Sequence, residues 1–238
     1  DTDEAARMIA PHASEGAVVV DLQNGVDNPE RMRRAGVDPI VAVVYVAAAI
    51  ETPGAVKHRG RGDLVIGHRS RASEVERVAA WFVRAGVSCQ VSEDVERELW
   101  FKLILNSMTN AVSALTGASY GALAAFESTW QVACDVAREG IAVARAAGHD
   151  FDQETMIARG LEVCRAVGAA TSSTQQDIAR GRPTEIDALN GFIARRGTEL
   201  EIETPINRVL WALVKLREQH DQPHHQKRTA DADHGEAD

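Results

Sequence analysis

The stretch AVVVDLQNG, residues 17–25, decides the fold of the first part of the chain. Its apolar run ends at Asn24 and Gly25, a pair that favours a turn. A second apolar run, VAVVYVAAAI, occupies residues 41–50, and helical patterns at 2–9 and 29–34 flank the two runs. Near-continuous apolar strands between helices are typical of a sheet covered on both faces. We therefore predict an α/β unit here.

The remaining chain changes from mixed patterns to helices alone. The segment HRGRGDLVIG, residues 58–67, is interpreted as a hairpin or tight turn, because its glycines do not follow the GxGxxG spacing. Further strands are predicted at 55–58, 63–66 and 88–91, with a helix at 73–86. From residue 95 the helical patterns are 95–115, 128–147, 152–169, 184–200 and 205–218. Residues 1–94 and 95–218 are thus predicted as two domains, and the polar tail 219–238 as disordered.

Charge and cysteine usage narrow the class of partner. A formal net charge of −9 over 238 residues argues against binding to nucleic acid or to an anionic membrane, since both need a basic surface. Cys89, Cys134 and Cys164 lie far apart without metal-ligand spacing, so neither a disulfide framework nor a zinc site is expected. No apolar run has the length of a membrane span, and the acidic start is unlike a signal peptide. We predict a cytoplasmic protein that holds no metal and whose partners are small molecules or proteins.

Residues 95–115 contain an unusual polar row. Lys102, Asn106 and Asn110 follow one another at i, i+4 and i+8 on an otherwise apolar helix. The row is either a polar seam between packed helices or the lining of a cleft. A lysine among apolar neighbours is costly to bury unless it faces a partner, and lysines in clefts perform acid/base chemistry. The lysine therefore favours the cleft.

Two other segments carry candidate polar groups. Glu185 and Asp187 follow Thr184 in the predicted first turn of a helix, where the dipole favours carboxylates and a purely structural role suffices. Asn24 follows an apolar strand, and ligands of open α/β sheets lie beyond the carboxyl ends of the strands. Its other interpretation is a simple turn residue.

Several stretches together resemble the ketopantoate reductase (2-dehydropantoate 2-reductase) family. They are QNG after the first strand, PGAVKHRGRGDLVIG, ELWFKLILNSMTNAVSALTG, and SSTQQDIARGRPTEIDALNGFIARRGTELEIETPIN. The resemblance implies a partial α/β Rossmann domain followed by an all-α domain similar to the C-terminal domain of 6-phosphogluconate dehydrogenase. It also implies an active site in the cleft between them, and NADPH-dependent reduction of 2-dehydropantoate to pantoate on the way to pantothenate and coenzyme A.

The resemblance carries roles to matching positions. Lys102 would be the catalytic general acid, and Glu185 would bind the substrate hydroxyl and contact the cofactor. Asn24 would lie near the nicotinamide. Substrate contacts would come from Asn106, Asn110 and Ser173, with Asp177 a weaker candidate in the same segment. The chemistry agrees, because an ammonium can both stabilise a developing alkoxide and protonate it.

One departure from the family pattern affects the nucleotide site. Members begin with a strand and a GxGxxG turn that receives the pyrophosphate, and neither precedes Asp1. Residues 1–94 would then be the remainder of an NADP-binding Rossmann domain, and NADPH binding by this truncated chain is expected to be weak or absent. Two alternatives stay open: a paralogous reductase of another 2-keto acid, and a non-catalytic fragment acting as a helical interaction module. The resemblance also implies a homodimer through the helical domain.

Overall fold

A computed structural model of the chain describes the backbone of residues 2–14 and 16–233, and their side chains except at 47, 49–51, 59–61 and 221–233. Contacts divide the chain into two compact units, Asp1–Lys102 and Leu103–Asp238. The division falls inside helix α4 (Val95–Thr116), and not at the predicted 94/95 boundary. The reason is that α4 is one continuous helix whose first turns pack on the sheet of the first unit.

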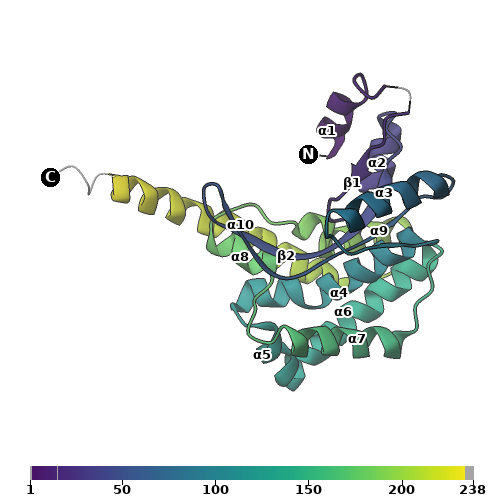
Figure 1. The fold of residues 1–238 in the computed structure, drawn as a ribbon. Coiled ribbons are helices and arrows are strands. Elements are labelled where there is room, and N and C mark those ends of the chain that lie inside the picture. The colour runs from purple at the N-terminus through teal and green to yellow at the C-terminus, as the bar shows by residue number, and fades with distance from the viewer. Residues whose placement is uncertain (1, 15, 234–238) are drawn as a thin grey trace. The chain divides into compact units, whose positions relative to one another are not determined.

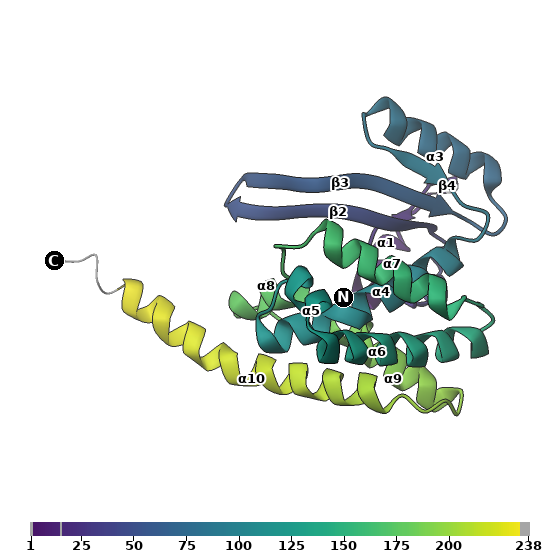
Figure 2. The ribbon, with the colours of Figure 1, turned by 90° about the horizontal axis from the view of Figure 1, so that it is seen from below.

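The first unit is the predicted α/β unit (Figure 1). Its sheet has the order β1-β2-β3-β4, in which β1 and β2 are parallel, β2 and β3 antiparallel, and β3 and β4 parallel. The strands β2 and β3 form a long hairpin that Figure 2 shows side by side. The elements in chain order are α1 (Thr2–Ile9), β1 (Val20–Asp21), α2 (Asn28–Arg34), β2 (Ile40–Thr52), β3 (Ala55–Gly67), α3 (Ala72–Arg84) and β4 (Cys89–Val91).

Residues 58–67, interpreted as a hairpin or tight turn, lie in a hairpin but do not form its turn. These residues belong to β3, and the chain turns instead at Gly54, whose φ of 84° suits glycine. Gly67 has a packing role, because a Cβ there would lie 2.7 Å from both the Ser92 carbonyl oxygen and the Val95 Cβ. The glycine thus allows close approach of the chain entering α4, and no turn is needed to explain it.

Both faces of the sheet are covered, as the apolar runs predict. Alternate residues of β2 point to opposite faces. Ile40 and Ala42 pack with Val75 and Val78 of α3, while Val41 and Val43 pack with the first turns of α4 through Val95 and Leu99. α4 is therefore held to the sheet by an apolar face near its start.

The second unit is helical, which confirms the predicted all-α region. Besides the rest of α4 it contains α5 (Tyr120–Ala125), α6 (Glu127–Ala146), α7 (Gln153–Ala166), α8 (Ser173–Ala179), the 3₁₀ helix η1 (Ile186–Ala188), α9 (Asn190–Glu199) and α10 (Pro205–Asp233). Its core joins α4, α5, α6, α8, η1 and α10 through buried side chains that include Ile178, Ile186 and Val214. Among the helices of the described chain, none is both long and apolar enough to cross a membrane.

Two features of this unit differ from what the sequence predicts. The helix predicted at 184–200 is split into η1 and α9, because Leu189 adopts a non-helical backbone with φ −106° and ψ −109°. The short helices α5 and α8 were not predicted. α10 extends through part of the predicted tail to Asp233, and the disorder predicted for residues 219–238 stays a prediction. Residues 234–238 of the predicted tail lie outside the described chain.

Candidate active site

Lys102 is placed by the face of α4 that packs on the sheet. Val95, Leu99 and Lys102 are spaced at i, i+4 and i+7, so they share one side of the helix. Val95 and Leu99 pack beside Val43 of β2. The same face brings Lys102 to the next residue of β2, where its Nζ donates a hydrogen bond to the Val44 carbonyl oxygen at 2.6 Å.

A second hydrogen bond joins Lys102 to the loop after β1. Its Nζ donates to Asn24 Oδ1 at 2.6 Å and lies 5.7 Å from the centroid of the Tyr45 ring. Both hydrogen-bond acceptors are neutral, so they orient the ammonium without neutralising it. The aromatic ring adds a favourable cation–π contact. Lys102 and Asn24, two residues that the sequence singles out separately, thus meet in one unit.

The turn that carries Asn24 is held in place by Asn28. The Asn28 side chain is buried, donates to the Asn24 carbonyl oxygen at 2.7 Å, and accepts a hydrogen bond from Thr2 Oγ1 at 2.7 Å. Gly25 has a φ of 120°, and a Cβ there would lie 2.9 Å from Asn28 Nδ2. Gly25 therefore meets both a conformational and a steric requirement of the turn that presents Asn24.

The polar row of α4 runs from a half-buried to a buried environment. Lys102 and Asn106 are half-buried, whereas Asn110 is 3% exposed. Asn110 Oδ1 accepts a hydrogen bond from the Tyr120 hydroxyl at 3.1 Å, and burial raises the pKa of Tyr120 to about 12. The Asn110 carbonyl oxygen accepts another from Ser172 Oγ at 3.2 Å. Asn110 thus joins α4 to the starts of α5 and α8, whatever it contributes to substrate binding.

The other predicted site residues lie together on α8 and just before η1. Ser172 caps α8 by accepting the Gln175 N–H, so the exposed Ser173 begins the helix and the half-buried Asp177 follows one turn later. Burial raises the pKa of Asp177, and the negative charge of Glu185 raises it further. Asp177 and Glu185 are therefore close enough to interact electrostatically.

The core explains why these two carboxylates are neighbours. Asp177 immediately precedes Ile178, and Glu185 immediately precedes Ile186. Both isoleucines are buried in the same core cluster, 4% and 0% exposed. Their anchoring brings the half-buried Asp177 and the exposed Glu185 to the same side of the second unit.

Sequence reasoning missed several groups around these residues. The Val44 carbonyl is a main-chain group, which no residue pattern identifies. Tyr45, beside Lys102, belongs to a run that indicates only a strand. Trp211 and Lys215 bind Asp187 from α10, and a polar residue on an amphipathic helix is ordinarily interpreted as solvent-exposed. In the described part of the chain, no group of three His, Cys, Asp or Glu side chains could hold a metal ion.

Two family models cover most of the chain. The model for ketopantoate reductase PanE/ApbA matches residues 1–71, and the model for its C-terminal region matches residues 94–218. The chain belongs to the ketopantoate reductase family. This is a family of NAD(P)-dependent oxidoreductases, and the family resemblance inferred from the sequence is confirmed.

Relatives and solved structures agree with this membership. A 2-dehydropantoate 2-reductase of Pyrococcus horikoshii is 36% identical over 204 residues, which cover 84% of this chain and 67% of the relative. The crystal structure of a PanE/ApbA family ketopantoate reductase from Ralstonia eutropha JMP134 is 44% identical with a TM-score of 0.84, covering 93% of this chain and 74% of that one. Ketopantoate reductases share the fold with more distant enzymes, since D-mandelate dehydrogenase solved with NADH has a TM-score of 0.87 at 21% identity, over 92% of this chain and 75% of that one.

Proposed function

We propose that this chain supplies the catalytic lysine and the substrate contacts of a reductase that converts 2-dehydropantoate (ketopantoate) to pantoate with NADPH, in the biosynthesis of pantothenate and coenzyme A. The observation that supports this most directly is the Lys102 ammonium, held at 2.6 Å by both Asn24 Oδ1 and the Val44 carbonyl oxygen. A positioned ammonium is a general acid suited to a carbonyl oxygen that gains negative charge. Family membership supplies the reaction class, and the geometry supports the proton donor.

The surroundings of Lys102 fit a nicotinamide. Asn24 follows β1, which runs parallel to β2, and ligands of open α/β sheets lie beyond the carboxyl ends of such strands. The Asn24 amide is exposed at this edge and is hydrogen-bonded to the lysine. An amide here suits the carboxamide of a nicotinamide. When bound, NADPH supplies the hydride.

The protein's part in the reaction is proton transfer and orientation. As the new C–H bond forms at the keto carbon, the π electrons of the C=O bond move to the oxygen. Lys102 Nζ donates its proton to that oxygen, which completes the hydroxyl group of the product. Lys102 is then a neutral amine that takes up a proton from water. Asn24 and the Val44 carbonyl keep Nζ in place through this cycle.

The remaining roles follow the residue types. Glu185 accepts a hydrogen bond from the substrate hydroxyl and contacts the cofactor. Amide and hydroxyl groups of Asn106, Asn110 and Ser173 bind the substrate carboxylate, with Asp177 beside Glu185. Neutral donors bind a carboxylate without neutralising the catalytic lysine. The same proposal includes NADPH as the particular nicotinamide cofactor, a cytoplasmic location and a homodimer through the helical domain. Measuring the molecular mass of the protein in solution tests the homodimer.

The test is NADPH oxidation with a panel of 2-keto acids, comparing Lys102→Ala with the exposed-lysine control Lys57→Ala. The assay is run on this chain and also on the polypeptide extended by any residues that the same reading frame encodes before Asp1. We expect kcat with ketopantoate to fall by about a hundredfold to ten-thousandfold in Lys102→Ala and to be unchanged in Lys57→Ala. Unchanged turnover in Lys102→Ala would exclude the acid role. Turnover with another keto acid alone would identify a paralogous reductase, and none at all would favour a helical interaction module.

A further inference from the structure

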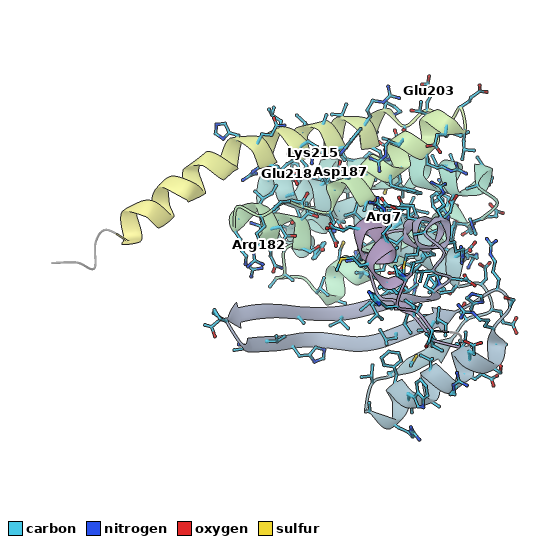
Figure 3. The ribbon with its side chains drawn as sticks, turned by 90° about the horizontal axis from the view of Figure 1, so that it is seen from above. Arg7, Arg182, Asp187, Glu203, Lys215 and Glu218 are labelled. Atoms are coloured by element: carbon cyan, nitrogen blue, oxygen red, sulfur yellow. The ribbon has the colours of Figure 1, made fainter. Side chains whose placement is uncertain are left out.

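A cluster of charged side chains contacts the main chain next to Glu185. Asp187 of η1 accepts a hydrogen bond from Trp211 Nε1 at 2.7 Å and another from Lys215 Nζ at 2.9 Å. Lys215 Nζ also lies 2.7 Å from Glu218 Oε2. Figure 3 shows Asp187, Lys215 and Glu218 gathered along α10. We name Asp187, Lys215 and Glu218 the α10 triad.

The triad forms a hydrogen bond with the main chain of Thr184, the residue before Glu185. Glu218 Oε1 accepts the Thr184 N–H at 2.7 Å. On the other side, Ile186 is fully buried, and its N–H donates to Thr184 Oγ1 at 3.2 Å. Glu185 is thus an exposed residue between two anchored neighbours, and one anchor is a carboxylate from α10.

Glu218 is an unusual residue to use for this purpose. Its side chain is only 6% exposed, and a buried carboxylate is costly unless it is paired and hydrogen-bonded. Lys215 provides the pairing charge, and its hydrogen bond to Glu218 is the main cause that raises the lysine's pKa. Burial by itself would raise the pKa of Asp187, but hydrogen bonds from Lys215 and Trp211 outweigh it and lower that pKa. Lys215 and Asp187 are therefore stabilised in their charged forms, and Lys215 contacts both carboxylates of the triad.

We propose that the α10 triad positions Glu185 for the substrate, with Glu218 as the residue that fixes the Thr184 main chain. Packing of the segment needs only Ile186, whereas a carboxylate that contacts a substrate hydroxyl must be held within a fraction of an ångström. The triad members act through Glu185 and contact no substrate themselves. The kinetic part of the proposal rests on the role proposed above for Glu185, but the structural part does not.

Asp177 provides a reporter of Glu185 that is independent of activity. The negative charge of Glu185 is one of the two causes that raise the pKa of Asp177, after burial. Any change that lets Glu185 move away should therefore lower the pKa of Asp177. A change on α10 that leaves Glu185 in place and Asp177 equally buried should leave the pKa of Asp177 unchanged.

The first experiment is an NMR titration of the Asp177 carboxyl in the 238-residue chain. Glu218→Met removes the acceptor for Thr184 at similar volume, Glu218→Gln keeps an acceptor oxygen, and Lys215→Met provides a second disruption should Glu218→Met fold poorly. Arg217→Gln is the matched control, because Arg217 is also on α10 but donates to the carbonyls at the end of α4. We expect a lower Asp177 pKa in both methionine variants, recovery in Glu218→Gln, and no change in Arg217→Gln. An Asp177 pKa that falls in Glu185→Gln but stays at the wild-type value in both methionine variants would overturn the proposal.

The second experiment measures kinetics with ketopantoate and with trimethylpyruvate, the same keto acid without its hydroxyl. A contact made equally in ground and transition states changes KM and leaves kcat alone. We expect Glu218→Met to raise KM for ketopantoate about tenfold, to leave kcat within about twofold, and to reduce the preference over trimethylpyruvate. If Glu185→Gln keeps the wild-type preference, the role of Glu185 fails while the Asp177 titration still decides the positioning. If Glu185→Gln loses the preference and Glu218→Met keeps it, the positioning proposal fails.

Discussion

Replacing Gly191 by alanine should destabilise the second unit through Trp211. Gly191 lies in the first turn of α9, and a Cβ there would lie 2.8 Å from Trp211 Nε1, 3.0 Å from Cε2 and 3.1 Å from the Ile186 carbonyl oxygen. The nearest atoms belong to a rigid indole ring and to backbone, so neither can yield cheaply. The indole nitrogen is also the donor to Asp187 Oδ1, so movement of the ring breaks that hydrogen bond.

The expected change in the free energy of unfolding combines two destabilising effects and one stabilising effect. Overpacking a rigid neighbour costs about 1–3 kcal/mol. Loss of the hydrogen bond from Trp211 to Asp187 adds about 1–2 kcal/mol, towards the lower end because the Asp187 side chain is half-exposed. Alanine in place of glycine in a helix returns at most about 1 kcal/mol. The net effect is a loss of about 1–4 kcal/mol in the free energy of unfolding of this unit.

Urea denaturation followed by circular dichroism measures the loss, and Gly160→Ala is the matched control. A Cβ at Gly160 of α7 would also meet a side chain, at 2.7 Å from Cε and 3.0 Å from Sδ of Met108, but this buried side chain is unbranched and can change its rotamer, unlike an indole ring. We expect Gly160→Ala to stay within about 1 kcal/mol of the parent. Equal stability of Gly191→Ala and the parent would refute the claim that Trp211 is held against α9 and Asp187.

Two further substitutions test the turn near Lys102 and the buried end of the α4 row. Gly25→Ala places a side chain at φ 120° and 2.9 Å from Asn28 Nδ2, so we expect a loss of at least about 1 kcal/mol of stability together with slower NADPH oxidation, and wild-type values for both would contradict the role of the turn. Tyr120 has a folded pKa of about 12 against 10.0 for an ordinary tyrosine, so the unfolded chain ionises first and stability falls as pH rises from 10 towards 12. Tyr120→Phe should lack this part of the fall, a difference of about 1 kcal/mol between about pH 9 and about pH 11 in urea denaturation, and parallel pH profiles would exclude it.

Local spacing predicts a large part of this site. The i, i+4, i+8 row identifies Lys102, Asn106 and Asn110 as one side of a helix, and the structure has them on α4. The turn signal at Asn24 and Gly25 is likewise local, because a positive φ is a property of one residue. Local spacing cannot predict the hydrogen-bond acceptors of Lys102. They lie 78 and 58 residues away in sequence, and one of them is a backbone carbonyl.

For Asp187 the local sequence likewise fails to identify the hydrogen-bond partners. Its position three residues after Thr184 predicts an acidic first turn, for which the helix dipole is a sufficient explanation. In the structure it lies in a short 3₁₀ helix, and its partners are Trp211 and Lys215 on α10. A local window explains why a carboxylate is acceptable at this position but assigns it the wrong partner, because both actual partners lie on α10, 24 and 28 residues further along the chain.

Glu218 can be interpreted only once the burial of its side chain is known. At the end of the predicted helix 205–218 it resembles any solvated glutamate before a polar tail. Burial changes its meaning, since a carboxylate 6% exposed needs compensating donors, and those donors are Lys215 and the Thr184 main chain. An apolar side chain could fill the same volume without the cost of desolvation. The retained charge therefore indicates a requirement at Thr184 that packing does not meet, and the residue beside Thr184 is Glu185.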